Sequence, residues 1–469
     1  MSDAHFDMVI IGGGPAGYGA ALYAASAGLT VGLVERDKVG GTCLHRGCIP
    51  AKELLETAAV TRTVRDAHEF GVLTSEPGLD FAKTMQRKQG IIDGLTKGVQ
   101  GLLKRRKVQS YDGTGRLGPN RTVSIDLTDG SVTSITGDFV LLAAGSVPRQ
   151  LPGFDVTGNL IMTSDEVLSM PSVPTTAAVI GGGAIGCEFA SMMADLGSQV
   201  TILEGFDQIV PGVDPDISKA LARSFKKRQI KVVTGVRVTG HTAAPDGKST
   251  TVHLEGADDV TVEAVVVSIG RRPFSDLLGL EATAVVVDER GHVQVDEYCR
   301  TAEPGVYAVG DLINTPALAH IGFAEAIVAV KDLLGEAPIP VDYAKVPWAI
   351  YCHPEVAFAG LTEQQAKDAG YSVVVSSHRY IGNSRAQIIN ETDGLVKIIA
   401  EDNGDGTGGV ILGVHMMGPW VTEQLGQGYL AVNWEATVDD VAQFIQPHPT
   451  LSELFGESVL AMTGRSLHG

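Results

Sequence analysis

The chain has little of three things: long apolar runs, positive charge and cysteine. No stretch of its 469 residues approaches the roughly 18 apolar residues that a membrane-spanning helix needs. The start, MSDAHFD, is acidic rather than basic, which argues against a secretory or transit leader. Lys and Arg number 36 against 55 Asp and Glu, and a net charge of -19 would repel a phosphate backbone. We therefore expect a cytoplasmic protein without a membrane or nucleic-acid partner.

Five cysteines in a chain of this length do not make a disulfide scaffold. Cys187, Cys299 and Cys352 lie far apart, in apolar or strand-like surroundings, and we expect them to be buried and inert. Only Cys43 and Cys48 are close neighbours. In a cytoplasmic protein such a pair indicates redox chemistry or metal binding before it indicates a structural bridge.

What the chain does contain is a strand–glycine turn–helix–strand unit at its beginning. An apolar strand over 7–11 leads into GGGPAG, a helix-like stretch to about Gly28, and a strand over 29–35 that ends in Glu35. Glycines at this spacing allow a tight turn, close approach of a pyrophosphate and close helix packing, while the acid accepts from ribose hydroxyls. The glycines of the G-x-G-x-x-G pattern are Gly12, Gly14 and Gly17.

The same unit recurs at a constant offset of 169 residues, the difference between positions 181 and 12. A chance glycine cluster would not reproduce both the helix-ending glycine and the acid, so two dinucleotide sites are expected. No Arg follows Glu204 closely, and the second site should therefore prefer NAD(H) to NADP(H). The equivalent positions are Gly12, Gly17, Gly28 and Glu35 in the first unit and Gly181, Gly186, Gly197 and Glu204 in the second.

Three further strands are expected to end in glycine turns, over 139–149, 264–273 and 306–311. Beyond about residue 345 the composition changes, and alternating apolar segments predict a separate α+β domain. The stretch 404–409, GDGTGG, reads as a hairpin turn. The expected fold is α/β, with two Rossmann-like dinucleotide-binding domains followed by a C-terminal α+β domain.

Cys43 and Cys48 are five positions apart, which suits neither a zinc knuckle nor a C-x-x-C motif, and we expect no metal. A regular helix would separate their Cα atoms by about 7.5 Å of rise, too far for a disulfide. A bridge therefore requires an irregular turn, which Gly40, Gly41 and Gly47 could permit before the helix that begins near Pro50. A nearby helix N-terminus should lower the pKa of these thiols.

His448 lies between two prolines in QPHPTLSE and can exchange a proton with a dithiol near neutral pH. Glu453 could orient its ring, as an acid does in other thiol enzymes. Thr450 and Glu453 also have capping-box spacing at the start of the last helix. Both roles for Glu453 stay open.

Taken together, GGTCLHRGCIPAK, the two glycine fingerprints, VYAVGD and HPTLSE resemble the FAD-dependent pyridine nucleotide–disulfide reductases, from about residue 5 to residue 458. The resemblance implies FAD in the first site, NAD in the second and a homodimer formed by the C-terminal domain. It implies domain boundaries at 1–150 for FAD, 151–273 for NAD, 274–345 for a segment completing the FAD domain, and 346–469 for the interface.

The resemblance also implies roles for single residues. Cys48 is the flavin-side thiol in charge-transfer contact, and Cys43 is the interchange thiol that exchanges with substrate sulfur. Lys52 lies by the flavin ring and pairs with Glu188; without the resemblance, a solvated helix lysine would be the ordinary reading. His448 is the base and is supplied by the other subunit.

The cofactor-binding residues that the resemblance implies fall into two sets. On the FAD side they are Gly12, Gly14, Pro15, Ala16, Gly17, Glu35, Gly41, Thr42, Lys52, Gly115, Ala144, Gly145, Ser146, Glu188, Gly310, Asp311, Leu318, Ala319 and His320. On the NAD side they are Gly181, Gly183, Ala184, Ile185, Gly186, Glu204, Val238 and Gly270.

The chain departs from the family pattern at a few positions. Gln446 replaces a histidine that many relatives carry, and Ala144 stands where a threonine is frequent. Because His448 is retained, we expect altered tuning rather than loss of activity. His45 and Arg46, between the two cysteines, could change thiol acidity or substrate access.

The resemblance implies oxidation of protein-bound dihydrolipoamide with NAD, in a 2-oxoacid dehydrogenase complex whose lipoyl domains and acyltransferase core are the partners. Glutathione-type reduction is disfavoured by Glu204, and no cysteine follows Cys352 to serve the larger thioredoxin reductases or mercuric reductase. Two alternatives remain: an NAD(P)H-dependent reductase of another small disulfide, and a chiefly structural docking subunit.

Overall fold

The computed structural model describes residues 4–75 and 78–468, which form two compact units. The first comprises Met1–Leu54, Asp80–Arg149 and Gly270–Tyr343, and the second comprises Leu55–Leu79, Gln150–Ile269 and Ala344–Gly469. Helix α3 (Cys48–Asp66) begins in the first unit and ends in the second. Within the described residues, no helix is both long and apolar enough to cross a bilayer.

The first unit is built on a parallel sheet in the order β3-β2-β1-β5-β16. In the same sheet, β4 pairs antiparallel with the C-terminal half of β3 and with the N-terminal part of β5. Strands β6 and β15 form a separate, short antiparallel pair. The strands are β1 (Ala4–Ile11), β2 (Val31–Glu35), β3 (Gln109–Leu117), β4 (Thr122–Leu127), β5 (Val132–Leu142), β6 (Ser146–Pro148), β15 (Arg271–Pro273) and β16 (Val306–Ala308).

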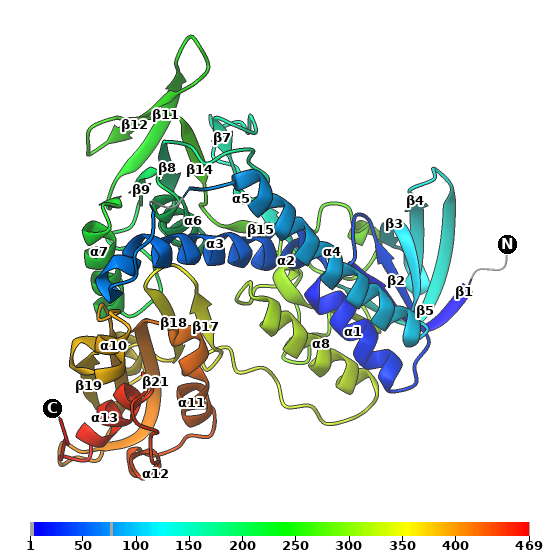
Figure 1. Ribbon diagram of the computed structural model, residues 1–469. Coiled ribbons are helices and arrows are strands. Elements are labelled where there is room, and N and C mark those ends of the chain that lie inside the picture. Colours follow the sequence, from blue (N-terminus) through cyan, green and yellow to red (C-terminus); the bar gives the residue numbers. More distant parts are fainter. Residues whose placement is uncertain (1–3, 76–77, 469) are drawn as a thin grey trace. The chain divides into compact units, whose positions relative to one another are not determined.

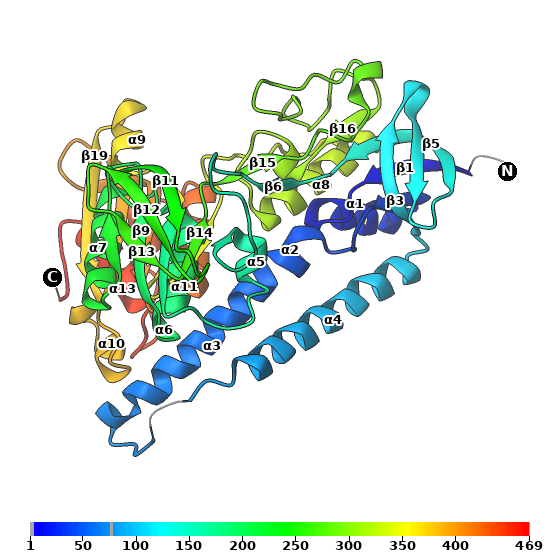
Figure 2. The same ribbon diagram turned by 90° about the horizontal axis from the view of Figure 1, so that it is seen from above.

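Both faces of this parallel sheet are buried, which explains its nearly continuous apolar strands. Met8, Ile10 and Leu33 pack against α1 and α8, which lie side by side (Figures 1 and 2). Val9 and Val34 face the opposite way, toward β4 and the segment before β16. The helices of this unit are α1 (Pro15–Ser26), α2 (Gly41–Arg46), the beginning of α3, α4 (Phe81–Arg105) and α8 (Ala319–Leu333).

The second unit contains a five-stranded parallel sheet in the order β10-β9-β8-β14-β7 and a three-stranded antiparallel sheet, β11-β12-β13 (Figure 1). The strands are β7 (Ile161–Met162), β8 (Thr176–Ile180), β9 (Gln199–Leu203), β10 (Lys231–Val233), β11 (Arg237–Ala243), β12 (Thr250–Glu255), β13 (Val260–Val262) and β14 (Ala264–Val267). The helices are α5 (Ser164–Val167), α6 (Ala184–Asp195) and α7 (Pro215–Lys227).

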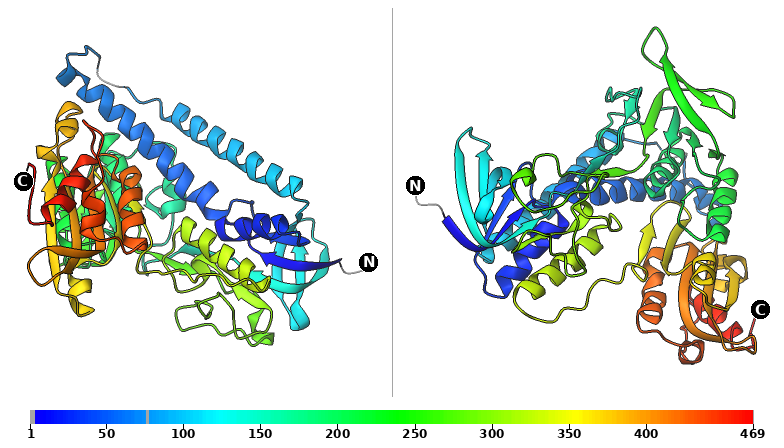
Figure 3. Two further views of the ribbon diagram at one scale, coloured as in Figure 1. Left: turned by 90° about the horizontal axis from the view of Figure 1, so that it is seen from below. Right: turned by 180° about the vertical axis from the view of Figure 1, so that it is seen from behind.

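The rest of the second unit is an antiparallel sheet, β17-β18-β21-β20-β19, on which the orange-red α11 and the red α13 pack (Figure 3). The turn expected over 404–409 joins β20 to β21 as a hairpin, which confirms that prediction. The elements are β17 (Trp348–Ile350), β18 (Glu355–Gly360), α9 (Glu363–Asp368), β19 (Val373–Arg379), α10 (Ser384–Ile388), β20 (Leu395–Asp402), β21 (Gly408–Gly418), α11 (Val421–Asn433), α12 (Val438–Ala442) and α13 (Glu453–Ala461). The α/β class and the C-terminal α+β region expected from the sequence are both confirmed.

Candidate active site and dinucleotide loops

The first glycine loop has no room for side chains at two of its positions. Gly12 has φ +109°, and a Cβ there would lie 2.2 Å from the carbonyl oxygen of Ala143. A Cβ on Gly17 would lie 1.8 Å from the carbonyl oxygen of Gly12. Glycine is therefore required for the turn and for the close packing of α1 on β1.

The second loop repeats this geometry. Gly181 has φ +102°, and a Cβ there would lie 2.5 Å from the carbonyl oxygen of Ser268. A Cβ on Gly186 would lie 1.9 Å from the carbonyl oxygen of Gly181. The repeat seen in the sequence is thus a repeat of backbone contacts.

The acids that end β2 and follow β9 are also equivalent in their hydrogen bonds. Glu35 accepts from the amide of Gly13 through Oε2 at 2.6 Å and from that of Asp37 through Oε1 at 2.8 Å. Glu204 accepts from Gly182 at 2.6 Å and from Phe206 at 2.9 Å. Each carboxylate oxygen keeps a further lone pair for a ribose hydroxyl. The carboxylates hold the glycine loops in addition to the ribose role expected from the sequence.

The two close cysteines lie at a break between helices. Cys43 is in α2 and Cys48 begins α3, while Gly47 between them has φ −149° and ψ −115°, outside the helical region. This confirms that the turn is irregular. Both cysteines are half-buried, and no disulfide joins them in this structure.

The cysteine segment is attached to the first glycine loop. The amide of Gly40 donates to the carbonyl oxygen of Gly13 at 2.8 Å. Gly41 has φ +58°, and a Cβ there would lie 2.6 Å from the Cα of Gly14. The backbone of the cysteine segment therefore touches the loop that is expected to hold FAD.

The expected lowering of thiol pKa is wrong for Cys43. Hydrogen bonding with Cys48, burial and the charge of Cys48 raise the pKa of Cys43, although the ammonium of Lys52 acts in the opposite direction. Two interacting thiols titrate as a pair, and the negative charge of one opposes ionisation of the other.

Tyr18 is a residue near the thiols that the sequence did not single out. Burial first, and then the charges of Cys43 and Cys48, raise the pKa of its hydroxyl. Its ring meets Phe323 edge-on, with centroids 5.5 Å apart. In the sequence, its place in the first turn of α1, directly after the glycine loop, was the one feature that could have indicated a position near the thiols.

The other three cysteines are buried, as expected. Burial is the main cause that raises the pKa of Cys187, Cys299 and Cys352. They are therefore poor nucleophiles. Among the described residues, no cluster of His, Cys, Asp or Glu could hold a metal ion.

The histidine near the C-terminus is oriented by the expected glutamate. His448 Nδ1 lies 2.9 Å from Glu453 Oε1, and Glu453 Oε2 accepts from the amide of Thr450 at 2.8 Å. Burial would raise the pKa of Glu453, but the bonds from Thr450 and His448 outweigh it and lower the pKa. One carboxylate thus contacts both partners. Only one bond of the expected capping box forms, from the amide of Thr450 to Glu453. The N-cap of α13 is Ser452 instead, and its side chain makes no capping hydrogen bond.

The family model described as "Pyridine nucleotide-disulphide oxidoreductase" matches residues 6–326, and the model for the dimerisation domain of the same family matches 346–459. The chain belongs to the pyridine nucleotide–disulphide oxidoreductase family. It is an FAD- and NAD-using disulfide oxidoreductase. The dimerisation domain supports a homodimer.

The similar proteins found span the whole chain. Dihydrolipoyl dehydrogenase of Bacillus subtilis is 42% identical, with 99% of each chain covered. Dihydrolipoyl dehydrogenase of Zymomonas mobilis is 38% identical, with 100% of each covered. Among solved structures, LpdA from Mycobacterium tuberculosis matches with a TM-score of 0.90 at 26% identity, covering 98% of this chain and 99% of that one.

The loops of this oxidoreductase fit the two cofactors. Gly14 and Gly183 are the N-caps of α1 and α6, and no side chain of the described residues caps either helix. A Cβ on Gly183 would meet nothing within 4 Å, and one on Gly14 only the Cα of Gly41 at 3.9 Å. Free amides, a helix N-terminus and open space suit a pyrophosphate.

On the FAD side of the oxidoreductase, Ser146 and Asp311 are joined. Ser146 Oγ donates to Asp311 Oδ2 at 2.5 Å. Arg271 donates from Nε to Ser146 Oγ at 2.7 Å and from Nη2 to Ser146 O at 2.8 Å. Arg271 was missed, because its partner is 125 positions away and only the GRRP turn marked it.

The expected pair of Lys52 and Glu188 takes one residue from each unit and stays a prediction. Lys52 is on α3, one turn beyond Cys48. Glu188 is buried on α6, and its Oε1 accepts from the amide of Tyr351 at 2.9 Å. The segment before β18 therefore fixes the orientation of this carboxylate.

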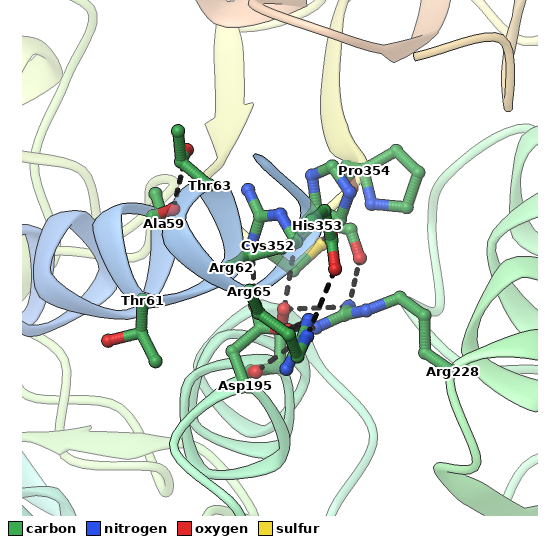
Figure 4. Close-up of polar contacts among 12 residues, drawn as sticks. Ala59, Thr61, Arg62, Thr63, Arg65, Asp195, Arg228, Cys352, His353 and Pro354 are labelled. Atoms are coloured by element: carbon green, nitrogen blue, oxygen red, sulfur yellow. Dashed lines mark hydrogen bonds and ion pairs between the residues drawn. The ribbon is translucent and has the colours of Figure 1, made fainter. Parts of the chain in front are cut away.

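The same face of α6 carries a polar cluster that sequence reasoning missed (Figure 4). Asp195 binds Nη1 of Arg62 at 2.6 Å and Nη2 of Arg228 at 2.8 Å. Ser191 Oγ accepts from the amide of His353 at 2.9 Å and from Arg228 at 3.0 Å. Burial and then the arginine charges hold the pKa of His353 well below 6.5. This cluster anchors the helix whose N-terminus is the second glycine loop.

The remaining predicted residues lie in strands, in glycine turns and at the starts of helices. Gly145 and Gly270 have positive φ of +71° and +106°, as glycine turns require. Gly310 also has positive φ, and its amide donates to the buried Glu325 at 2.6 Å. Their roles remain predictions. The others are Pro15 and Ala16 at the start of α1, Thr42 in α2, Gly115 in β3, Ala144 after β5, Leu318, Ala319 and His320 at the start of α8, Ala184 and Ile185 at the start of α6, and Val238 in β11.

The positions that depart from the family pattern have local partners. His45 Nε2 lies 2.9 Å from the carbonyl oxygen of Val39, and Arg46 pairs with Asp37 at 2.6 Å. Gln446 Nε2 donates to Gln427 Oε1 at 3.3 Å. His45 and Arg46 thus support the loop between β2 and α2.

Proposed function

We propose that this oxidoreductase transfers two electrons from protein-bound dihydrolipoamide to NAD through the Cys43–Cys48 pair. The observation that carries the proposal is the pair Cys43 and Cys48 at the break between α2 and α3, in a segment whose Gly40 amide donates to the first glycine loop. The 42% identity to a protein named dihydrolipoyl dehydrogenase, over almost the whole of both chains, supports lipoamide as the substrate.

In the oxidised pair, a substrate thiolate attacks Cys43 Sγ, the Cys43–Cys48 bond breaks, and Cys48 leaves as a thiolate. His448 then takes the proton of the second substrate thiol, which attacks the sulfur joined to Cys43 and closes the lipoyl disulfide. Cys43 is released as a thiolate, and the one proton taken from the substrate stays on His448 or returns to this thiolate. Bound FAD supplies the carrier for the two electrons, which leave as hydride to NAD.

Other side chains orient these groups. Glu453, held by the amide of Thr450, keeps the ring of His448 in one orientation and stabilises its protonated form. Glu204, already bonded to two amides, presents a carboxylate that favours a free ribose hydroxyl over a 2′-phosphate. The ammonium of Lys52 favours negative charge on Cys43.

We extend the proposal to the assembly. The homodimer brings His448 of one subunit to the thiols of the other, and the enzyme serves a 2-oxoacid dehydrogenase complex through lipoyl domains and the acyltransferase core. The domain boundaries at 150, 273 and 345 and a cytoplasmic location belong to the same proposal.

The test supplies purified flavoprotein with NAD and dihydrolipoamide and follows the absorbance of NADH. Steady NADH formation supports the proposal. The rival outcome is no reaction with these substrates together with reduction of another small disulfide by NADPH, which would assign the protein to the reductases instead. A solved structure of HOCl-induced flavoprotein disulfide reductase RclA from Escherichia coli, with a TM-score of 0.86 at 26% identity, supports this rival reaction.

A further inference from the structure

The loop between β9 and α7 covers the NAD-side glycine loop through an unusual residue. Val210 is buried and has φ +45°. Its amide donates to the carbonyl oxygen of Gly182 at 2.6 Å. A Cβ on Gly182 would lie 2.9 Å from Ile209 Cγ2, so the two segments are in close contact. The position of Gly182 therefore depends on the conformation of Val210.

The FAD half shows what is unusual about this valine. There the amide of Gly40 donates to the carbonyl oxygen of Gly13, the equivalent of Gly182, at 2.8 Å. Gly40 also has positive φ, at +105°. Glycine adopts left-handed backbone freely, whereas a β-branched residue there is strained. Val210 performs the task of Gly40 with a residue that does not favour the conformation, so its surroundings must hold it.

Buried hydrogen bonds tie this loop to the start of α7. The amide of Val213 donates to the carbonyl oxygen of Val210 at 3.1 Å, and Ser218 Oγ donates to that of Ile209 at 2.7 Å. Asp214 is the N-cap of α7, and its side chain is fully buried. Its Oδ1 accepts from the amide of Asp216 at 3.0 Å. The first turn of α7 thus fixes the loop that carries Val210.

A lysine contacts the first turn of α7 from the antiparallel sheet β17-β18-β21-β20-β19, which we call the dimerisation sheet. Lys397, on β20, is buried with 3% of its side chain exposed. Its Nζ lies 3.0 Å from Asp214 Oδ1, 2.8 Å from Asp216 Oδ2 and 2.9 Å from Glu363 Oε2. Burial would lower the pKa of Lys397, but the three carboxylates outweigh it and raise the pKa. One ammonium therefore lies among three carboxylates and offsets part of the repulsion between them.

We propose that Lys397 is a positioning residue for the NAD site: from the dimerisation sheet it holds the first turn of α7, and thereby keeps Val210 in the left-handed conformation that secures the Gly182 loop. No residue of β20, the strand that carries Lys397, is among the residues expected to bind a cofactor. Without its charge, Asp214, Asp216 and Glu363 repel, the first turn of α7 shifts, and Val210 relaxes toward a common conformation.

The test measures ADP-ribose binding to the FAD-loaded protein by calorimetry. ADP-ribose carries the adenosine and diphosphate of NAD but cannot accept hydride, so the measurement is independent of turnover. Lys397→Met should weaken binding about tenfold, equivalent to about 1.4 kcal/mol. FAD content should not change, and KM for NAD should rise with a much smaller change in kcat.

A double-mutant cycle separates positioning from general stability. In a Val210→Gly background, Lys397→Met should weaken ADP-ribose binding less than threefold, because glycine adopts φ +45° without support. A matched control is Lys227→Met. It removes an exposed ion pair to Asp393 at the opposite end of α7 and should leave ADP-ribose binding unchanged.

Two outcomes would overturn the proposal. One is binding within twofold of wild type in folded Lys397→Met protein. The other is an equal loss of affinity in the valine and glycine backgrounds, which would show that Lys397 acts only through overall stability. If Lys397→Met does not fold, Lys397→Gln, which keeps a donor for the carboxylates but no charge, is carried through the same cycle with the same criteria.

Discussion

At the scale of single residues, the two dinucleotide loops depend on glycines that pack directly against backbone oxygens. Gly17 and Gly186 occupy equivalent places, and in both the Cβ of any other residue would overlap a carbonyl oxygen. The acids Glu35 and Glu204 bind the loops at equivalent amides. The offset of 169 residues predicts that the two units are equivalent at these positions, whereas the hydrogen bonds from the acids to the loops are seen only in the structure.

Gly186→Ala should impair the NAD site without removing FAD. A methyl group at this position would lie 1.9 Å from the carbonyl oxygen of Gly181, so α6 must move away from its strand. We expect a loss of about 3 kcal/mol in the free energy of unfolding and much weaker ADP-ribose binding. Urea denaturation and calorimetry check this.

The control for that variant is Gly94→Ala, in the middle of α4, where an added Cβ would meet nothing within 4 Å. Alanine favours helix there and should stabilise the protein by about 0.5–1 kcal/mol. A Gly186→Ala protein as stable as wild type would show that the loop tolerates a side chain.

Glu453→Gln should slow turnover about tenfold or more while the dimer persists. The amide still accepts from Thr450, but it no longer stabilises the protonated ring of His448. Steady-state kinetics with NAD in excess measures kcat, and gel filtration measures the dimer. Unchanged kcat would mean that Glu453 serves only the start of α13.

At the scale of elements, α6 is held at several points along its polar face. Its N-terminus is a glycine loop, and its polar face is bound at Glu188, Ser191 and Asp195. The partners come from segments 163, 162 and 133 positions away. Such contacts leave no local pattern, which is why the βαβ units and the cysteine break were predictable from the sequence whereas the Asp195 cluster and Arg271 were not.

His353 should make the protein sensitive to mild acid. Its folded-state pKa lies well below 6.5, so the unfolded chain binds a proton that the folded protein does not. Stability from this group is therefore complete above pH 6.5 and falls as the pH drops below it, by up to about 1.4 kcal/mol per pH unit.

Urea denaturation between pH 5 and pH 7.5 checks this, with His353→Gln as the comparison. The variant should lose less stability than wild type on going to pH 5, because glutamine does not titrate. The amide of residue 353 still reaches Ser191 in the variant, so the main anchoring bond is kept. Parallel curves for the two proteins would contradict the assignment.

At the scale of the whole molecule, the proposed reaction needs groups from two subunits. Within one chain, Cys43 and Cys48 belong to the first compact unit. His448, whose ring is exposed, belongs to the second compact unit of that chain. The dimerisation domain over 346–459 contains His448. The sequence suggested this arrangement only through its resemblance to the family, because a single chain carries no pattern that marks a site shared between subunits.

Mixed dimers test the shared site. Cys43→Ser and His448→Ala proteins should each be nearly inactive as homodimers. When the two are co-expressed and the mixed dimer is isolated, one of its two sites contains both wild-type groups, and about half of the wild-type activity per dimer should return. A mixed dimer as inactive as its parents would place both groups of each site in one subunit.

The most direct test of the central claim is the complete reaction of a Cys48→Ser variant with dihydrolipoamide and NAD. The account predicts that wild-type protein forms NADH continuously, while the variant retains FAD and its dimeric state but forms none. NADH formation by Cys48→Ser at the wild-type rate would show that electrons do not pass through the Cys43–Cys48 pair.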